Sequence, residues 1–452
     1  MQSGVICLVA VFLLGGAAMS AAANDSIGGP GLVDVPAVEA RARRAGLRVL
    51  AGNHLVLVTD RPLRAGDGVE ELPAVFDQAF TAWCRHYEID PAAHADWRAF
   101  GCLIVDRERF RAAGLLPDKL PPFENGFCDR NRFWLVDQSN PAYRRHLLLH
   151  EGVHAFTLTL RRLATPVWYT EGIAEYLATH RLDPAIDGGV EFVPTPIPDR
   201  PGDVEQLGRI EKIRELHEAG RPPSLGSVLA LPAGRHGEIA DYAASWAAVT
   251  LFARHPAYAA GFTTLEQGEL GPDLNLRLAA MPGWDGARAE QDFDAFTSEI
   301  DYGWDFSRMA IDWSPGQPLA GECVVAVNAD RGWQNSGLRS AAGERIAFVA
   351  TGRAGVGTIT DTKTGAVTPL ETEANGISLE WYRGRPLGRL LVGQWLAGGG
   401  AGERPRFAVV ADGAGGEFIA PANGPLFVRL NGPPGRLAVG DGAISVRFRP
   451  GQ

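Results

Sequence analysis

This chain of 452 residues has fewer basic than acidic side chains. It carries 43 Lys and Arg residues against 53 Asp and Glu residues, so its formal net charge is −10. Proteins that bind nucleic acid without a sequence motif usually do so through a broad basic surface. The charge balance therefore argues against a nucleic-acid partner. Hydrophobic residues make up 46% of the chain, which excludes an intrinsically disordered composition.

Long apolar runs are also missing, apart from one at the N-terminus. Residues 5–19 are apolar, but this run is shorter than the roughly 20 residues that a membrane-spanning helix needs. Small residues follow at 20–23, and polar residues after them. This order is typical of a signal peptide. We expect a signal peptide over 1–23 and an exported protein, periplasmic or extracellular, with no transmembrane span in the mature chain. Because residues 1–4 lack Lys and Arg, an uncleaved N-terminal anchor is the alternative.

Cysteine is scarce, with five in the whole chain. Cys7 would leave with the signal peptide. The other four could oxidise in an exported protein, and four cysteines allow three pairings. A Cys102–Cys128 bridge is the favoured pairing, because both residues flank strand-like segments. The cysteine spacing does not match a zinc ribbon, which argues against a cysteine-ligated metal.

Two regions with different residue patterns follow the N-terminus. Strand-like runs come first and helical patterns later up to about residue 310, which predicts an α+β domain. From 323 to 449, short apolar runs alternate with Gly-rich turns, which predicts an all-β sandwich. A Pro- and Gly-containing stretch at 314–318 indicates a linker. We therefore expect one domain over 24–313 and a β-sandwich domain over 318–452.

One short motif in the first domain contains residues that could bind a metal ion. Residues 150–154 read HEGVH, an H-E-x-x-H pattern, in a helix that Asn140 could cap and Pro141 could begin. His150 and His154 are four residues apart, so both imidazoles lie on one helix face and can bind one metal ion. Glu151 can then reach a metal-bound water. The alternative is a coincidental helix whose polar groups are satisfied within the protein.

A catalytic zinc site needs a third protein ligand and one open position. A turn at 164–166 lets a second helix return beside the first, and this helix offers Glu171 and Glu175. Glu171 would face the histidines; the alternative is a carboxylate stabilised by the helix dipole. Glu175 lies one turn further along the same face. It is either a partner that supports a metal-bound histidine or a structural ion pair.

The two motifs together carry a resemblance. HEGVH followed by WYTEGIAEY resembles the gluzincins, zinc metallopeptidases with two His and one Glu as ligands, and in particular the peptidase-MA-like group of exported bacterial proteins. The resemblance spans about residues 50–310 and implies a zincin-like fold with Zn²⁺ as cofactor. It implies His150, His154 and Glu171 as metal ligands, and a hydrolase acting on peptide bonds of a peptide or protein substrate. His154 and Glu171 are closer in sequence than in the aminopeptidase branch, so aminopeptidase activity is not implied.

Roles for further residues follow from this resemblance. Glu151 would act as general base on the metal-activated water. Tyr242, on a later helix, would stabilise the oxyanion; the alternative, which the residue type favours, is an aromatic side chain packed beside Trp246. The strand at 133–136 would form the edge of the substrate cleft. Other candidates for the oxyanion donor are His217, His236 and Tyr169.

The C-terminal region carries a second resemblance. Segments 331–338, 342–346, 426–435 and 444–446 resemble the β-sandwich of the PA-I galactophilic lectin, which implies a galactose-binding-like fold. That family binds a sugar through calcium, but the corresponding positions here lack most of the oxygen ligands that calcium needs. They read Gly432, Arg436, Val439 and Gly440. The competing hypothesis is a secreted carbohydrate- or surface-binding protein whose metal region is a pseudopeptidase scaffold, with glycan or cell-surface contact through the C-terminal domain.

Overall fold

The computed structural model describes residues 32–451 except 63, 65, 186–188, 205–207, 233–237, 399–404 and 438–441. The expected signal peptide therefore lies outside the described residues. The chain divides into two compact units. The first runs to Ile213 and includes Leu225–Ala253 and Tyr258–Gly286, whereas the second comprises Arg214–Ser224, Arg254–Ala257 and Ala287–Gln452. None of the described helices combines the length and apolar character needed to cross a membrane.

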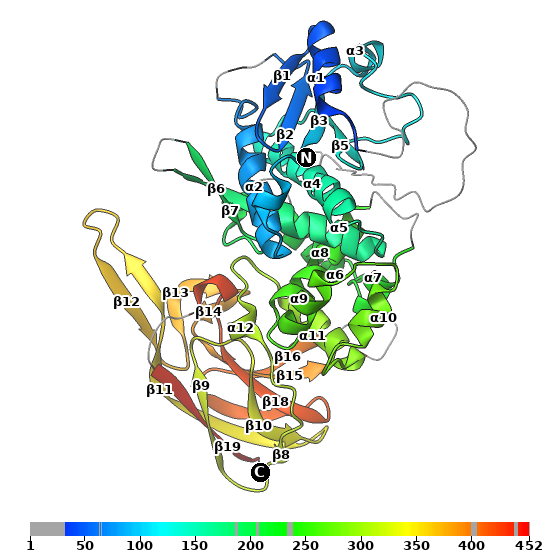
Figure 1. The fold of residues 1–452 in the computed structure, drawn as a ribbon. Helices are drawn as coiled ribbons and strands as arrows, with labels where there is room; N and C mark the ends of the chain where they lie inside the picture. Colours follow the sequence, from blue (N-terminus) through cyan, green and yellow to red (C-terminus); the bar gives the residue numbers. More distant parts are fainter. Residues whose placement is uncertain are drawn as a thin grey trace. The chain divides into compact units, whose positions relative to one another are not determined.

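The first unit contains a five-stranded sheet with strand order β1-β2-β3-β5-β4 (Figure 1). β2, β3 and β5 run parallel to one another, and β1 and β4 are antiparallel strands at the two edges. β2 and β3 are buried along their whole length, as the apolar runs in the sequence predict. The five strands are β1 (Arg48–Ala51), β2 (Leu55–Thr59), β3 (Ala99–Ile104), β4 (Gly126–Asp129) and β5 (Arg132–Val136).

Helices cover both faces of this sheet. The helix α1 packs with alternate residues of β2 and β3 on one face, whereas Phe76 of α2 stacks against Phe133 of β5 on the other. The α4 helix begins at Pro141, and the Asn140 side chain accepts a hydrogen bond from the amide of Tyr143, as predicted. The elements of this unit are α1 (Val35–Arg44), α2 (Leu72–His86), η1 (Pro91–His94), α3 (Arg107–Ala112), α4 (Pro141–Leu160), α5 (Val167–Ala178), β6 (His180–Pro184), β7 (Val190–Pro194), η2 (Pro201–Val204), α6 (Arg209–Glu218, shared with the second unit), α7 (Leu225–Leu229), α8 (Ile239–Arg254), α9 (Ala259–Gln267) and α10 (Leu274–Ala279).

Two glycines allow the helices around the H-E-x-x-H motif to approach closely. A Cβ atom on Gly152 of α4 would lie 2.4 Å from Cε2 of Phe76 and 2.9 Å from Cη2 of Trp83, both on α2. A Cβ atom on Gly172 of α5 would lie 2.4 Å from the carbonyl oxygen of Ser245 on α8. Glycine inside a helix costs about 1 kcal/mol relative to alanine. Close packing against α2 and α8 offsets that cost.

The second unit is a β-sandwich with helices beside it. One sheet has the order β16-β15-β18-β10-β8, and the other has the order β12-β11-β19-β9 with β17 also paired to β11. Leu426 and Val428 of the first sheet share a buried core with Ile444 and Val446 of the second. The strands are β8 (Gln317–Pro318), β9 (Cys323–Asn328), β10 (Gln334–Ser340), β11 (Arg345–Thr360), β12 (Val367–Thr372), β13 (Ile377–Tyr382), β14 (Arg385–Leu387), β15 (Leu390–Leu396), β16 (Arg406–Asp412), β17 (Gly415–Ile419), β18 (Gly424–Leu430) and β19 (Gly442–Pro450), with η3 at Pro434–Arg436.

Helices α11 (Gly286–Glu299) and α12 (Phe306–Met309) precede the expected linker in the sequence but pack within the second unit. Arg429 of β18 donates a 3.0 Å hydrogen bond to Glu299, and the indole nitrogen of Trp313 donates one of 2.8 Å to Asp292. These bonds connect α11 to the sandwich. The domain limits at 313 and 318 stay a prediction.

The four described cysteines are all free, so the preference for a Cys102–Cys128 bridge is wrong. Cys102 of β3 lies opposite Trp134, and Cys128 of β4 lies opposite Phe133, with β5 between the two cysteine strands. Two strand spacings separate the cysteines by roughly 9 to 10 Å. A disulfide requires Cα atoms within about 7 Å of each other.

Candidate metal centre

Three side chains from α4 and α5 meet in the first unit. His150 and His154 lie one turn apart on α4, and their Nε2 atoms are 3.0 Å from each other. The α5 helix brings Oε2 of Glu171 to 3.5 Å from each of these nitrogens. All three side chains are at most 3% exposed. The residues predicted as metal ligands therefore come together, and their ligand atoms are close enough to hold one ion.

The spacing of these atoms fits a tetrahedral ion. Ligand atoms about 2.0 to 2.1 Å from a tetrahedral zinc ion lie about 3.3 to 3.4 Å from each other. The three distances here are 3.0, 3.5 and 3.5 Å. Two imidazole nitrogens and one carboxylate oxygen are also a ligand set that zinc uses at catalytic sites.

The charges around these atoms also favour a dication. Glu151, Glu171 and Glu175 are at most 3% exposed, and the guanidinium of Arg209 binds Glu175. Buried carboxylates are costly unless an opposite charge compensates them, so a cation beside Glu171 is favoured. Burial alone would lower the pKa of His150, but the Glu171 and Glu175 carboxylates outweigh it and raise this pKa to about 10. The cluster thus attracts positive charge.

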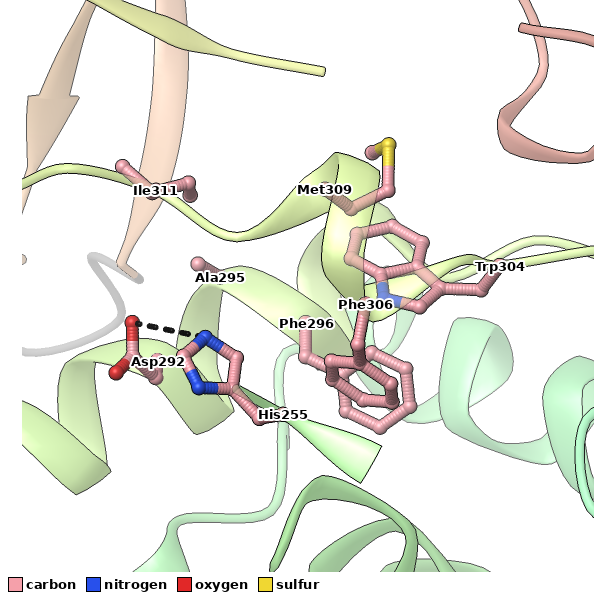
Figure 2. Close-up of a pocket in the computed structure, with 8 residues that line it drawn as sticks. All are labelled: His255, Asp292, Ala295, Phe296, Trp304, Phe306, Met309 and Ile311. Atoms are coloured by element: carbon pink, nitrogen blue, oxygen red, sulfur yellow. Dashed lines mark ion pairs between the residues drawn. The ribbon is translucent and has the colours of Figure 1, made fainter. Parts of the chain in front are cut away.

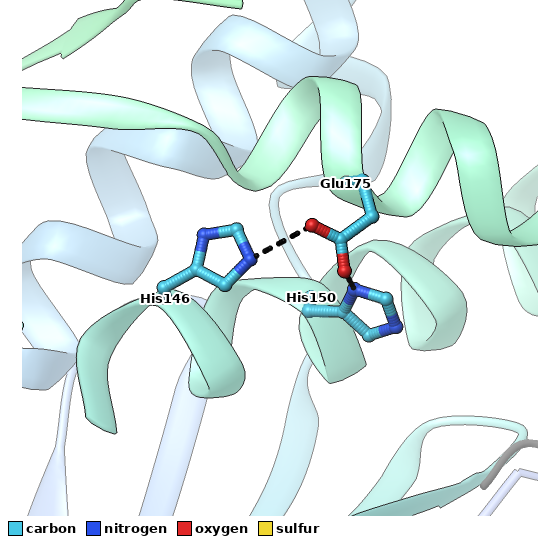
Figure 3. Close-up of side chains that lie close together, drawn as sticks. All are labelled: His146, His150 and Glu175. Carbon is cyan, nitrogen blue, oxygen red and sulfur yellow. Dashed lines mark hydrogen bonds and ion pairs between the residues drawn. The ribbon is translucent and has the colours of Figure 1, made fainter. Parts of the chain in front are cut away.

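Glu175 contacts His146 and His150 (Figure 3) and also binds Arg209. Arg209 donates hydrogen bonds of 2.9 Å and 2.6 Å to its two carboxylate oxygens. Nε2 of His146 lies 3.2 Å from Oε2, and Nδ1 of His150 lies 3.2 Å from Oε1. Burial opposes the charge, but Arg209 and the histidines hold the pKa of Glu175 well below its usual range. His146, His150 and Glu175 are also close enough for a metal ion, but the guanidinium already supplies a cation there.

Glu151 is buried beside the edge strand β4. Neither carboxylate oxygen has a hydrogen-bond partner among the described residues. Burial, reinforced by Glu171 and Glu175 and opposed by His150, raises the pKa of Glu151 to about 8. A Cβ atom on Gly126 would lie only 2.3 Å from Oε1 of Glu151. Because Gly126 has no side chain, the Glu151 carboxylate can occupy the space beside it.

The edge of the sheet next to this carboxylate is β4, not β5. The expectation that 133–136 forms the cleft edge is wrong, because β5 pairs with β3 on one side and β4 on the other. Asn125 accepts a hydrogen bond from the amide of Val136, so Gly126, one residue further, is a non-hydrogen-bonded position of this antiparallel pair. Its peptide groups point away from β5, toward the edge on which no described strand pairs.

Tyr242 of α8 borders the metal ligands. Its ring centroid lies 6.1 Å from that of His150 in an edge-on arrangement and 5.8 Å from the guanidinium carbon of Arg209. Tyr169, one of its rivals, donates a 2.8 Å hydrogen bond to Glu266 and lies 3.2 Å from the Tyr87 hydroxyl. Its hydroxyl is therefore engaged in that network. His217 belongs to the second unit, and His236 lies outside the described residues.

Arg209 and Gly126 are parts of this site that the sequence did not indicate, and His146, outside any motif, was interpreted as structural. His146 lies four residues before His150, so helical spacing places it on the same face, but this spacing alone did not distinguish a role at the site from a structural one. Arg209 is 34 residues from Glu175 and belongs to no motif. Gly126 contributes only by the absence of a side chain, for which no sequence signal exists.

Two residues in the lectin-like segment of the second unit make contacts within the protein. The Asn431 side-chain amide donates to three backbone carbonyl oxygens at 3.0 to 3.1 Å, and Arg436 forms an ion pair with Glu380. These two residues thus have structural partners, whereas Val439 and Gly440 lie outside the described residues. A small cavity is lined by His255, Asp292 and mostly apolar side chains (Figure 2). It offers no ligand set comparable to that on α4 and α5.

Comparisons with known proteins identify no family. No family model matches the chain, and no curated protein matches it. Solved structures to which it is similar include the EclA N-terminal domain, a PllA-like lectin, at 20% identity and a TM-score of 0.18, covering 29% of this chain and 98% of that chain. IMPa from Pseudomonas aeruginosa in complex with an O-glycopeptide matches at 14% identity and a TM-score of 0.15, covering 55% of this chain and 24% of that chain. IMPa metallopeptidase in complex with T-antigen matches at 12% identity and a TM-score of 0.15, and the match covers 92% of this chain and 44% of that chain. The chain thus spans less than half the length of either IMPa chain.

Proposed function

We propose that this chain is an exported zinc-dependent peptidase, with a zincin-like catalytic domain followed by a galactose-binding-like β-sandwich. His150, His154 and Glu171 would hold the zinc ion, and Glu175 would support His150. The observation that carries this proposal is the triangle of three buried ligand atoms, 3.0 to 3.5 Å apart, together with a buried Glu151 carboxylate whose charge acts on His150 and Glu171.

Zinc bound by these residues would polarise the scissile carbonyl and lower the pKa of its water toward about 7. Glu151 takes a proton from the attacking water and later delivers it to the leaving amine. Both of its oxygens lack a hydrogen-bond partner among the described residues, so the carboxylate is available for this transfer. Tyr242 donates a hydrogen bond to the developing oxyanion in this proposal. Its packing against His150 and Arg209 supports a purely structural role equally well.

A peptide substrate suits the edge of β4. The outward-facing peptide groups of Gly126 lie beside Glu151, where an extended chain could add as a further strand. Backbone hydrogen bonds to Gly126 would align a peptide bond with the general base. This placement replaces the strand 133–136 as the expected substrate contact.

Two variants and a control test the proposal. The purified chain should contain one zinc ion and cleave a fluorescently labelled casein, His154→Ala should lose both properties, and Glu151→Gln should keep zinc but lose hydrolysis. Asp292→Asn, which changes a buried carboxylate in the second unit, should retain both. If Glu151→Gln still cleaves at the wild-type rate with full zinc content, the assigned mechanism is wrong.

The same preparations address the rival hypothesis. A glycan array probed with the full chain would show binding if the β-sandwich is a carbohydrate- or surface-binding module. Glycan binding by a wild-type chain that holds no zinc and cleaves no casein would favour the pseudopeptidase scaffold.

A further inference from the structure

We infer that Arg209 is a positioning residue of the metal centre, and that its two hydrogen bonds to Glu175 fix the carboxylate that orients His150. The inference rests on the proposed zinc site. It concerns a residue that touches neither the three ligand atoms nor Glu151, and therefore acts through Glu175.

The contacts form a chain from α6 to the metal ligand. Arg209 is 8% exposed and binds Glu175 through Nε at 2.9 Å and through Nη2 at 2.6 Å, one bond to each oxygen. Such a two-bond arrangement fixes the plane of the carboxylate as well as its position. Oε1 then lies 3.2 Å from Nδ1 of His150, an ion-pair contact without hydrogen-bond geometry, and Oε2 lies 3.2 Å from Nε2 of His146 (Figure 3).

This arrangement determines which nitrogen of His150 can bind a metal ion. An anionic oxygen beside Nδ1 stabilises the proton on that nitrogen, and the lone pair is then on Nε2. Nε2 is the atom that lies 3.0 Å from His154 and 3.5 Å from Glu171. If Glu175 turned away, His150 would lose the negative charge that favours a proton on Nδ1.

Arg209 comes from a part of the chain separate from the two metal-binding helices. It is the first residue of α6 and follows Gly208, whose φ of +64° is readily adopted by glycine. The guanidinium carbon also lies 5.8 Å from the centre of the Tyr242 ring. Arg209 is thus held by α5 through Glu175 and by α8 through Tyr242, so a third helix supports the geometry of the site.

Removing Arg209 would change two properties with opposite effects. Loss of its positive charge would strengthen the binding of a cation nearby, whereas loss of its paired hydrogen bonds would weaken the hold on His150. Lysine keeps the charge but cannot donate two parallel bonds to one carboxylate. Arg209→Lys therefore isolates the positioning effect.

The test measures zinc affinity by competition with a chromophoric chelator, using the full-length chain. Arg209→Lys should bind zinc about 10- to 100-fold more weakly than the wild type, as is typical when a partner of a metal-bound histidine is lost. The Co²⁺-loaded variant should also show an altered visible absorption spectrum. Arg144→Lys is the matched control, because Arg144 is 2% exposed and donates a 2.7 Å hydrogen bond to the Asp137 carboxylate. It should bind zinc within twofold of the wild type.

A second variant keeps the test decisive if the first folds poorly. Arg209→Ala should show weakened zinc binding that added guanidinium ion restores at least in part, which a general folding defect would not do. Wild-type zinc affinity and an unchanged Co²⁺ spectrum in Arg209→Lys would overturn the inference and leave the proposed function standing. A wild-type chain that binds no zinc would instead overturn the proposed function.

Discussion

Replacing Gly126 by alanine should separate catalysis from stability. The new Cβ atom would lie 2.3 Å from Oε1 of Glu151, whereas ordinary contact begins at 3.4 Å. The Glu151 carboxylate must therefore move by about 1 Å, and misplacement on this scale costs about 100-fold in rate. That factor corresponds to about 2.7 kcal/mol of activation free energy. The clash involves the end of a flexible side chain, and Gly126 does not have a positive φ, so stability should change by less than about 1 kcal/mol.

The assay compares casein cleavage per zinc-loaded molecule with the free energy of unfolding in urea. Gly101→Ala is the matched control in the same sheet, because its Cβ atom would lie 2.5 Å from Cε2 of the buried Phe133 ring. It should lose about 1 to 3 kcal/mol of stability through overpacking but keep the rate per folded molecule. A Gly126→Ala variant with full zinc content and a rate within twofold of the wild type would refute the placement of Glu151 against β4.

Three further outcomes are expected. Zinc at 100 times its dissociation constant should add about 2.7 kcal/mol of stability, so a chelator should lower the melting temperature of the wild type but not of His154→Ala. Gly152→Ala should unfold at a lower urea concentration than the wild type, because Phe76 and Trp83 fill the space that the new Cβ atom needs. This clash should outweigh the gain of about 1 kcal/mol in helix propensity, and a rise in stability would contradict the packing. Thiol titration of denatured, never-reduced protein that lacks residues 1–23, and therefore Cys7, should find four reactive residues. Fewer would contradict the free state of Cys84, Cys102, Cys128 and Cys323.

The parts of the site that depend on short-range patterns could be predicted from the sequence. Asn140 and Pro141 mark the start of α4 because their cap and backbone preferences act within one turn. The four-residue spacing of His150 and His154 depends only on helix geometry. The turn before α5 likewise follows from the local chain, and it brings Glu171 back to the histidines.

The remaining features depend on contacts between distant segments. Whether β4 or β5 forms the sheet edge is decided by strand pairing, and a strand that is buried on both faces has the same composition in either place. The separation of Cys102 from Cys128 follows from that same order. The bond between Arg209 and Glu175 joins two helices with no shared motif, so only the folded chain identifies it.

The two glycines inside the metal motifs limit how far these motifs can be transplanted. In a general H-E-x-x-H pattern the third position is free, but here Gly152 leaves room for two aromatic rings of α2, and Gly172 leaves room for the backbone of α8. The identity of these positions is therefore coupled to the bulk of their neighbours. Grafting HEGVH and EGIAE onto another pair of helices would carry over the ligands but not the interhelical distance that brings them around one ion.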